Sequence, residues 1–255
     1  MCPAPEILMN FGRRVIPSRF RPLGYLSHLA MTRSGGRVMQ GPFTSMRYIG
    51  RSVGSAMVPK VLGIYERELA PVVEEAIHWG PDAVADAGAA EGYYAVGFAL
   101  RLPQARVIGY EIDPSGRAAL WEMAEMNGVR DRVEVRGKCE PDGLQADIAP
   151  AARPLVVCDV EGYEELLLDP ATVPALRKAA VLVETHELAR KGIGKMLEER
   201  FAPTHRIRPI LQEPRSADEF PWKTLYTRCL PQRYRDWTVS EWRRERMCWL
   251  WMTPR

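Results

Sequence analysis

The sequence predicts a doubly wound α/β fold, in which helices cover both faces of a mostly parallel sheet. Short apolar strands alternate with helical segments, and residues 154–159 and 180–184 are apolar almost throughout. Strands that are apolar on both faces are typical of parallel sheets buried between helices. In addition, the strand at residues 84–86 runs into a glycine-containing turn and then a helix. Such a turn is the usual ligand-binding turn of a Rossmann-like sheet.

The individual elements follow from periodicity and from residues that begin or end helices. Hydrophobic residues at three- and four-residue steps predict a helix over residues 59–77, which Pro71 breaks or restarts. Thr238 and Glu241 have the spacing of a capping box for a short helix. The expected strands are residues 84–86, 106–111, 132–136, 154–159, 180–184, 205–212 and 247–252. The other expected helices are residues 92–101, 114–127, 161–168, 172–178 and about 190–201.

The chain of 255 residues is long enough for one large domain with extensions. Residues 1–58 are rich in Pro, Gly, Arg and Ser and lack clear periodicity. We expect them to form an N-terminal arm that packs on the core or on a partner, which is compatible with a homodimer. Residues 59–255 are expected to form the α/β domain, with an irregular basic insert at about 213–246.

Composition excludes several classes of protein. Hydrophobic residues make up 46% and charged residues 26% of the chain, which is ordinary for a globular protein. No apolar run is long enough to cross a membrane, and the N-terminus lacks the pattern of a signal peptide. The five cysteines include no C-x-x-C pair, which argues against structural zinc. We therefore expect a cytoplasmic protein without a membrane partner.

The net charge of +3 is unevenly distributed along the chain. Residues 1–60 carry nine Lys and Arg residues and a single acid, Glu6. This basic stretch could bind an anionic partner such as RNA, or it could be a solvated surface. Because it lacks the interleaved aromatic residues of nucleic-acid modules, the sequence favours the solvated surface.

The turn after the first strand indicates the type of cofactor. It reads D-x-G-x-x-x-G, with acids at Asp86 and Glu91 and glycines at Gly88 and Gly92. A dinucleotide site instead uses G-x-G-x-x-G, which lets the backbone reach a pyrophosphate. Carboxylates repel a pyrophosphate but suit a ligand that carries an ammonium and a sulfonium. Together with Glu111 at the end of the second strand, the turn favours S-adenosylmethionine over NAD.

Three motifs resemble those of class I S-adenosylmethionine-dependent methyltransferases, and within that class of the FkbM-like branch. They begin at Asp86 (D-A-G-A-A-E-G-Y-Y), Tyr110 (Y-E-I-D-P) and Cys158 (C-D-V-E-G-Y-E). The third motif is the one typical of the FkbM-like branch. The resemblance covers roughly residues 60–190 and implies a seven-stranded sheet whose last strand inserts antiparallel.

The resemblance also implies how the cofactor is held. The turn after the first strand would line the methionine end, and Glu111 would bind both ribose hydroxyls. Ile112 and the loop at Lys138 and Cys139 would border the adenine. The expected cofactor-binding residues are Asp86, Gly88, Glu91, Gly92, Tyr93, Glu111, Ile112, Lys138, Cys139 and Asp159.

A cluster of ionisable residues is expected beside the transferred methyl group. Asp159 and Glu161 follow the fourth strand, and Glu184 and His186 end the fifth. The carboxyl ends of neighbouring parallel strands meet at one edge of the sheet, which is where ligands bind.

Three interpretations of this cluster remain open. Asp159 or His186, with Glu184, could be the catalytic base that removes a proton from the acceptor. Alternatively, Asp159, Glu161, Glu184 and His186 could hold a divalent metal ion such as Mg²⁺, Mn²⁺ or Fe²⁺. In the third interpretation, Glu161 and Glu164 merely complement a helix dipole, and His186 is an ordinary loop residue.

The function that this sequence predicts best is O-methylation of a small-molecule hydroxyl, on a sugar, a polyketide or a peptide-derived compound. An RNA or protein methyltransferase that docks its polymer through the basic arm is the first alternative. A metal-dependent enzyme or binding module on the same fold is the second. The intact pair of Asp86 and Glu111 argues against a degenerate cofactor site.

Overall fold

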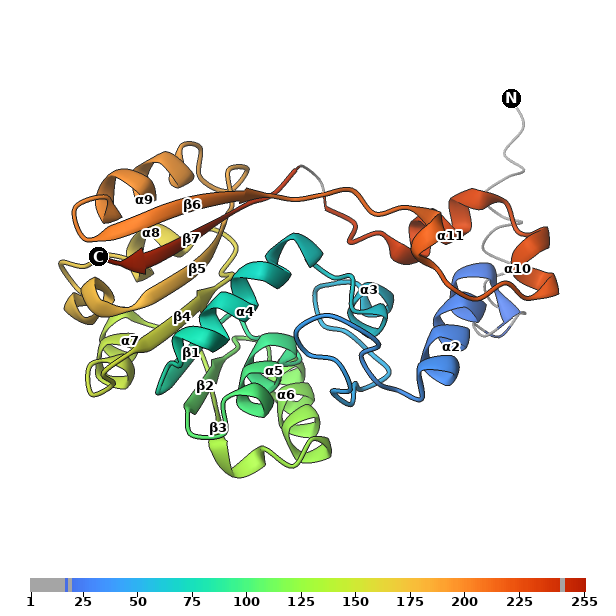
Figure 1. The fold of residues 1–255 in the computed structure, drawn as a ribbon, viewed down its shortest axis with the longest axis horizontal. Coiled ribbons are helices and arrows are strands. Elements are labelled where there is room, and N and C mark those ends of the chain that lie inside the picture. The colour runs from blue at the N-terminus through green and yellow to red at the C-terminus, as the bar shows by residue number, and fades with distance from the viewer. Residues whose placement is uncertain (1–16, 18–19, 244–245) are drawn as a thin grey trace.

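The computed structural model describes residues 17, 20–243 and 246–255. Its centre is a seven-stranded sheet in the order β3-β2-β1-β4-β5-β7-β6 (Figure 1). Strands β1 to β5 pair in parallel, and β7 inserts antiparallel between β5 and β6. The strands are β1 (Ala83–Ala87), β2 (Arg106–Tyr110), β3 (Val133–Arg136), β4 (Pro154–Cys158), β5 (Ala180–Thr185), β6 (His205–Leu211) and β7 (Cys248–Pro254). This arrangement confirms the predicted fold class.

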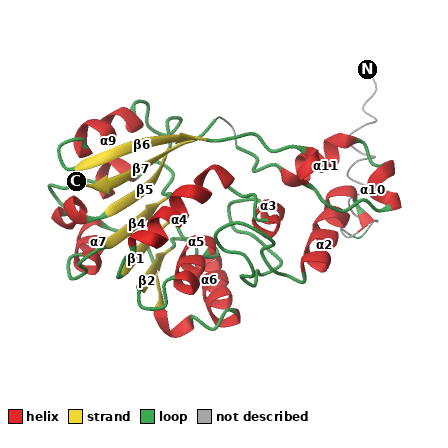
Figure 2. Ribbon diagram, in the orientation of Figure 1, coloured by secondary structure: helices red, strands yellow, loops and turns green. Residues whose placement is uncertain are grey.

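Helices cover both faces of the sheet (Figure 2). The described helices are α2 (Pro22–Ser34), α3 (Met57–Leu62), α4 (Ala70–Trp79), α5 (Tyr93–Arg101), α6 (Pro114–Met126), α7 (Pro141–Ile148), α8 (Glu164–Leu167), α9 (Ile193–Phe201), α10 (Leu225–Cys229) and α11 (Gln232–Val239). Of these, α2, α10 and α11 lie away from the sheet (Figure 1). Short 3₁₀ turns occupy Arg67–Leu69, Arg130–Arg132, Pro174–Lys178 and Ala217–Glu219. Among the described helices, none is long and apolar enough to cross a membrane.

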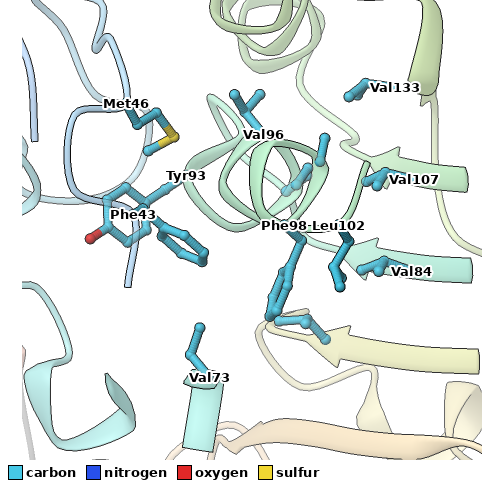
Figure 3. Packing of buried hydrophobic residues seen from close by; sticks show 14 of the residues in the cluster. Phe43, Met46, Val73, Val84, Tyr93, Val96, Phe98, Leu102, Val107 and Val133 are labelled. Carbon is cyan, nitrogen blue, oxygen red and sulfur yellow. The ribbon is translucent and has the colours of Figure 1, made fainter. Parts of the chain in front are cut away.

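Two hydrophobic clusters sandwich the sheet because successive residues of a strand point to opposite faces. Val84 of β1 packs in the cluster formed with α4, α5 and α6. Its neighbour Ala85 packs in the cluster formed with α7, α8 and α9. Figure 3 shows the first cluster, in which strand valines face Val96 and Phe98 of α5. Burial of both sheet faces explains why the parallel strands lack polar alternation.

Part of the expected arm belongs to the first cluster. Phe43 and Met46 are almost fully buried there, and the Phe43 ring meets the rings of Tyr93 and Phe98 edge to face (Figure 3). A Cβ atom on Gly97 would lie 2.6 Å from the Phe43 ring, so α5 must have a glycine at this position. The prediction of an arm that packs on the core therefore fits residues 38–49. Residues 1–16 and 18–19, where the arm was expected to begin, lie outside the described residues.

Several sequence-based boundaries are wrong. The predicted helix over residues 59–77 is two helices, and the break falls at Gly63, where a Cβ atom would lie 2.1 Å from the Gln40 carbonyl oxygen. Pro71 restarts the helix in the first turn of α4. The segment 161–168 is helical only in α8, 172–178 contains a 3₁₀ turn, and α7 was not predicted.

The predicted capping box at Thr238 and Glu241 does not exist. Helix α11 ends at Val239, and the Thr238 hydroxyl donates to the Tyr234 carbonyl within it. The carboxylate of Glu241 instead accepts hydrogen bonds from the Glu66 backbone N–H and from the Gln212 side chain. These bonds attach the insert to the rest of the chain.

The insert at residues 213–246 is the long connection from β6 to β7, and α10 and α11 lie beside α2 (Figure 1). Apolar residues of α2, α3 and the insert form a third hydrophobic cluster: Leu26, Leu29, Ala30, Val58, Leu62, Ile64, Phe220 and Val239. Arg215 reinforces this attachment, because its guanidinium lies 2.7 Å from Glu68 and 2.6 Å from Glu241, and all three side chains are buried. The insert is therefore bound by apolar packing and by buried ion pairs.

Replacing Arg215 with Met is expected to lower the free energy of unfolding by about 3–5 kcal/mol, because two buried carboxylates lose their cation. Urea denaturation followed by circular dichroism would measure the change. Arg208→Met is the matched control: its ion pair with Glu75 is exposed, so the expected loss is below about 1 kcal/mol. Equal losses in the two variants would contradict the role given to Arg215.

Candidate active site

A cavity of about 1020 Å³ opens at the carboxyl ends of β1, β2 and β4. This is the edge at which open α/β sheets bind ligands. The segment around Lys60 and the insert residues Trp242 and Arg243 complete its wall. Of the residues expected at the site, those that line the cavity are Asp86, Gly88, Tyr93, Glu111, Ile112, Lys138, Cys139, Asp159, Glu161 and His186. Glu91, Gly92 and Glu184 are not part of its lining.

Gly88 brings the turns after β1 and β4 into backbone contact. Its φ is +87°, and a Cβ atom would lie 1.7 Å from the Asp159 carbonyl oxygen. The N–H groups of Gly88 and Ala89 donate to the Tyr110 carbonyl at 3.0 and 2.9 Å, which also fixes the turn against β2. Only glycine meets both requirements, since other residues rarely adopt this φ and would collide. The turn therefore brings the carboxyl ends of β1, β2 and β4 close together.

Gly88→Ala is expected to lower the free energy of unfolding by more than about 3 kcal/mol, because backbone atoms of Asp159 block the added methyl group. Gly143→Ala in α7 is the control, because a Cβ atom there meets no atom within 4 Å. In a helix this change is expected to add about 0.5–1 kcal/mol. Thermal unfolding of both variants would measure the difference, and a Gly88 variant as stable as wild type would contradict the assignment.

The carboxylate of Glu111 is fixed at the end of β2. It accepts hydrogen bonds from the Ala90 N–H at 2.8 Å and from the Asp113 N–H at 2.7 Å. Gly116 leaves room for it, because a Cβ atom there would lie 2.6 Å from the Glu111 Cγ. Each carboxylate oxygen can accept a second hydrogen bond. Glu111 is thus a preorganised pair of acceptors on the cavity wall.

Three residues border the cavity next to Glu111. Ile112 is 72% exposed, which is unusual for an isoleucine, and Cys139 is buried at the start of the loop before α7. The Lys138 ammonium lies 4.2 Å from the centre of the Tyr163 ring. An apolar residue exposed only because it faces an open cavity is suited to pack against a flat ligand group.

Asp86 lies at the end of β1 with an unpartnered oxygen. The residue is 3% exposed, and its Oδ2 has no hydrogen-bond partner within the described part of the chain. Burial raises the pKa of Asp86 to about 7. A buried carboxylate with a free oxygen at a cavity wall is suited to a cationic ligand group.

Glu91 and Gly92 do not face the ligand cavity, contrary to the sequence-based expectation. The Glu91 carboxylate is fully buried and accepts hydrogen bonds from the Tyr48 hydroxyl, the Val53 N–H and Lys60. Although burial alone would raise its pKa, these donors hold the pKa of Glu91 below its ordinary value. Gly92 faces α6, where a Cβ atom would lie 2.2 Å from Leu120.

His186 stands at the centre of a carboxylate cluster. Its Nδ1 lies 2.5 Å from Glu164 Oε1, and its Nε2 lies 3.3 Å from Asp159 Oδ1 and 3.8 Å from Glu184 Oε2. The more exposed Glu161 reaches within 3.5 Å of Nε2. The predicted convergence of these four residues is therefore what the structure shows, with Glu164 in addition.

Four atoms of this cluster lack hydrogen-bond partners in the described part of the chain: Asp159 Oδ1, Glu164 Oε2, Glu184 Oε2 and His186 Nε2. Asp159, Glu184 and His186 offer ligand atoms that lie within 4.8 Å of one another. Burial and the charge of Asp159 raise the pKa of Glu184 to about 9. Burial alone would lower the pKa of His186, but the neighbouring carboxylates of Asp159 and Glu164 raise it to about 10. The cluster thus holds concentrated negative charge that attracts a proton or a cation.

Glu164 lies in the first turn of α8, as one interpretation supposed, but it also contacts His186. It is fully buried, and its Oε1 accepts a hydrogen bond from the Gly162 N–H at 3.0 Å in addition to contacting His186. By holding Nδ1, it turns Nε2 towards Asp159 and Glu184. Orientation of one imidazole nitrogen by a carboxylate is common in metal and catalytic sites.

Arg243 was not predicted, yet it lines the cavity and contacts the cluster. One guanidinium nitrogen lies 2.6 Å from Glu184 Oε1, and another pairs with Glu66. Glu66 in turn accepts a hydrogen bond from the Tyr94 hydroxyl at 2.5 Å. Arg243 therefore occupies one oxygen of Glu184 and leaves the other to face His186. The basic composition of the insert was the only sequence signal for this residue.

Comparisons with known proteins find methyltransferases. No protein-family model matches the chain. Over 69 residues the chain is 42% identical to the ribosomal protein L11 methyltransferase of Salmonella arizonae, which is 27% of this chain and 23% of that protein. The corresponding Vibrio cholerae protein gives the same identity over the same length. The chain thus spans about a quarter of the length of the curated relatives it matches.

Solved structures to which the chain is similar include the following two. Precorrin-6y C5,15-methyltransferase from Geobacter metallireducens has a TM-score of 0.49 at 11% identity, covering 74% of this chain and 88% of that one. An O-methyltransferase from Bacillus cereus, in complex with SAH, has a TM-score of 0.48 at 11% identity, covering 97% of both chains. The inserted antiparallel β7 in a seven-stranded sheet is the arrangement that the class I resemblance implies, and the chain has the fold of class I S-adenosylmethionine-dependent methyltransferases.

Proposed function

We propose that the protein is an S-adenosylmethionine-dependent methyltransferase that methylates a hydroxyl group of a small molecule. One observation carries the proposal: a single cavity contains both the fixed carboxylate of Glu111 and the unpartnered cluster around His186. The Glu111 carboxylate is suited to binding a nucleoside, and the cluster around His186 is suited to activating a methyl acceptor. The motif at Cys158 favours the FkbM-like branch, which stays a prediction, as does the cytoplasmic location.

The cavity residues fit the cofactor. Glu111 would accept hydrogen bonds from both ribose hydroxyls, and Ile112 and Cys139 would border the adenine. The free Oδ2 of Asp86 would accept a hydrogen bond from the ammonium of the methionine part. Lys138 and Tyr93 also line the cavity and would contact the cofactor at its two ends. When bound, the cofactor supplies an activated methyl group on a sulfonium.

Methyl transfer is an in-line displacement: the methyl–sulfur bond breaks, a methyl–oxygen bond forms, and the electron pair stays on sulfur. The protein positions the acceptor and removes its proton. His186 is already protonated at neutral pH when the cluster holds no cation, so it is a poor base in that state. Asp159 is the carboxylate placed to receive the proton, because burial raises its pKa but the contact with His186 holds it below the ordinary value. Glu184, whose pKa is raised to about 9, is itself protonated at neutral pH and stands beside His186 in the cluster.

A divalent cation is the second proposal for the cluster. Asp159, Glu184 and His186 would hold it, because each offers an unpartnered ligand atom at the same point. One imidazole with two carboxylates suits Mg²⁺, Mn²⁺ or Fe²⁺. A bound cation lowers the pKa of a hydroxyl that it contacts. Glu161 is more exposed and would contribute only at the entrance.

Protein methylation is the alternative function, and the similarity to ribosomal protein L11 methyltransferases favours it. In that case the basic arm would contact the protein or an RNA. The arm's first 16 residues lie outside the described structure, so RNA binding and a homodimer through the arm stay predictions.

The proposed function is tested by incubating the protein with S-adenosylmethionine and measuring S-adenosylhomocysteine formation. Separate reactions would contain phenols, sugars or purified ribosomal protein L11. We expect turnover with a hydroxylated small molecule, and a loss of about 100-fold or more in Asp159→Asn. Turnover only with ribosomal protein L11 would support the alternative and contradict small-molecule methylation.

A further inference from the structure

Lys60, which no prediction included, lines the same cavity as Asp86. It belongs to α3 and is 3% exposed, which is rare for a lysine without a dedicated partner. We propose that Lys60 binds the carboxylate of the cofactor's amino-acid end, while Asp86 binds its ammonium. This inference rests on the proposed function and adds the group that recognises the amino acid.

The contacts of Lys60 leave it able to bind a ligand. Its Nζ donates to the Ser55 hydroxyl at 2.7 Å and to the Glu91 carboxylate. It also lies 4.7 Å from the centre of the Tyr65 ring and 5.6 Å from that of the Tyr93 ring. An ammonium has three N–H donors, and two are used by these oxygens. The third remains for a ligand in the cavity.

The role of Glu91 follows from this arrangement. Its carboxylate accepts from Tyr48, Ser52, Val53 and Lys60, so its hydrogen-bonding capacity is filled within the protein. It therefore holds Lys60 in place through a buried ion pair. Glu91 acts as a positioning residue, and Lys60 is the residue that faces the ligand.

The charges on the wall match an α-amino acid. An amino acid carries an ammonium and a carboxylate on one carbon, so its site needs an anion and a cation close together. Asp86 supplies the anion with an unpartnered oxygen. Lys60 supplies the cation, and both side chains line the same cavity. Val53, Gly54 and Ser55 close the cavity beside them.

A purely structural ion pair is the competing explanation, because Lys60 and Glu91 also attach residues 48–55 to the start of α5. Two ligands separate the explanations. S-adenosylhomocysteine has the amino-acid part, and 5′-deoxy-5′-methylthioadenosine has the same nucleoside without it. If Lys60 binds the ligand, replacing it lowers the affinity for S-adenosylhomocysteine only. If Lys60 is purely structural, replacing it lowers the affinity for both ligands equally.

The experiment is calorimetric titration of the full-length protein with each ligand. The double variant Lys60→Met/Glu91→Gln avoids leaving a buried carboxylate without its cation, and Glu91→Gln alone is the matched control. We expect the double variant to bind S-adenosylhomocysteine about 10- to 100-fold more weakly than the control. Its affinity for methylthioadenosine should equal that of the control, which also shows that the site is folded.

Equal affinity of both variants for S-adenosylhomocysteine would overturn the inference, and so would an equal loss of both ligands in the double variant. These outcomes are distinct from failure of the proposed function. If wild-type protein binds S-adenosylhomocysteine but the double variant shows no selective loss, only the role of Lys60 is wrong. If wild-type protein binds neither ligand, the proposed function is wrong and the inference falls with it.

Discussion

Glu111→Gln is expected to weaken binding of S-adenosylhomocysteine about 100-fold. The carboxylate would accept two ribose hydroxyl hydrogen bonds, and hydrogen bonds to a charged group contribute about 1.5–3 kcal/mol each. Loss of the charge and of one acceptor therefore removes about 3 kcal/mol of binding free energy, which corresponds to about two powers of ten in affinity. Isothermal titration calorimetry would measure the change.

The same variant should remain folded. Gln keeps the shape of Glu111 and one carbonyl acceptor, so one of the two N–H donors, of Ala90 or Asp113, loses its partner. The expected loss of stability is about 1–2 kcal/mol. Glu125→Gln on the exposed face of α6 is the control and should change neither affinity nor stability. A Glu111 variant that binds as tightly as wild type would show that Glu111 does not bind the ribose.

His186→Ala is expected to reduce affinity for Mn²⁺ by more than about 100-fold, because it removes the only nitrogen ligand of the proposed set. Wild-type protein should bind one Mn²⁺ per chain. Electron paramagnetic resonance of unbound Mn²⁺ would follow the titration. Since Glu184 keeps its contact with Arg243 and Asp159 keeps its backbone position, the variant should stay folded.

His78→Ala is the matched control for the cluster, because His78 is exposed at the end of α4 and should not affect Mn²⁺ binding. Equal Mn²⁺ affinity in the His186 variant would contradict the metal proposal. Wild-type protein without Mn²⁺ or Mg²⁺ binding would also contradict it. In that case Asp159 would remain as the proton acceptor, and the proposed methyl transfer would be metal-independent.

The sheet could be predicted because the apolar residues of each strand reflect the burial of both strand faces. β4 is apolar throughout, and β5 is apolar from Ala180 to Val183, as expected of a sheet covered on both faces. The ends of these strands also placed Asp159, Glu184 and His186 correctly at one edge. Local sequence was sufficient here because the order of parallel strands follows from short helical crossovers.

The residues that sequence reasoning missed come from segments without periodicity or, for Lys60, from the first turn of the predicted helix over residues 59–77. Lys60 and Tyr48 belong to the region read as an arm or its boundary, so nothing indicated that they fill the hydrogen bonds of Glu91. Glu91 was therefore placed beside the ligand on the basis of its charge alone. Arg243 lies in the insert, where long-range ion pairs with Glu66 and Glu184 leave no local pattern. The roles of such residues depend on contacts between segments that are distant in the sequence. The spacing of residues within one motif does not reveal these contacts.

Titration of the wild-type protein with S-adenosylhomocysteine and, separately, with NAD tests the central claim most directly. The account predicts one S-adenosylhomocysteine site per chain, competed by S-adenosylmethionine, and no NAD binding, because Asp86 and Glu111 face the ligand as carboxylates. Binding of NAD with no binding of S-adenosylhomocysteine would contradict the cofactor assignment and, with it, methyl transfer.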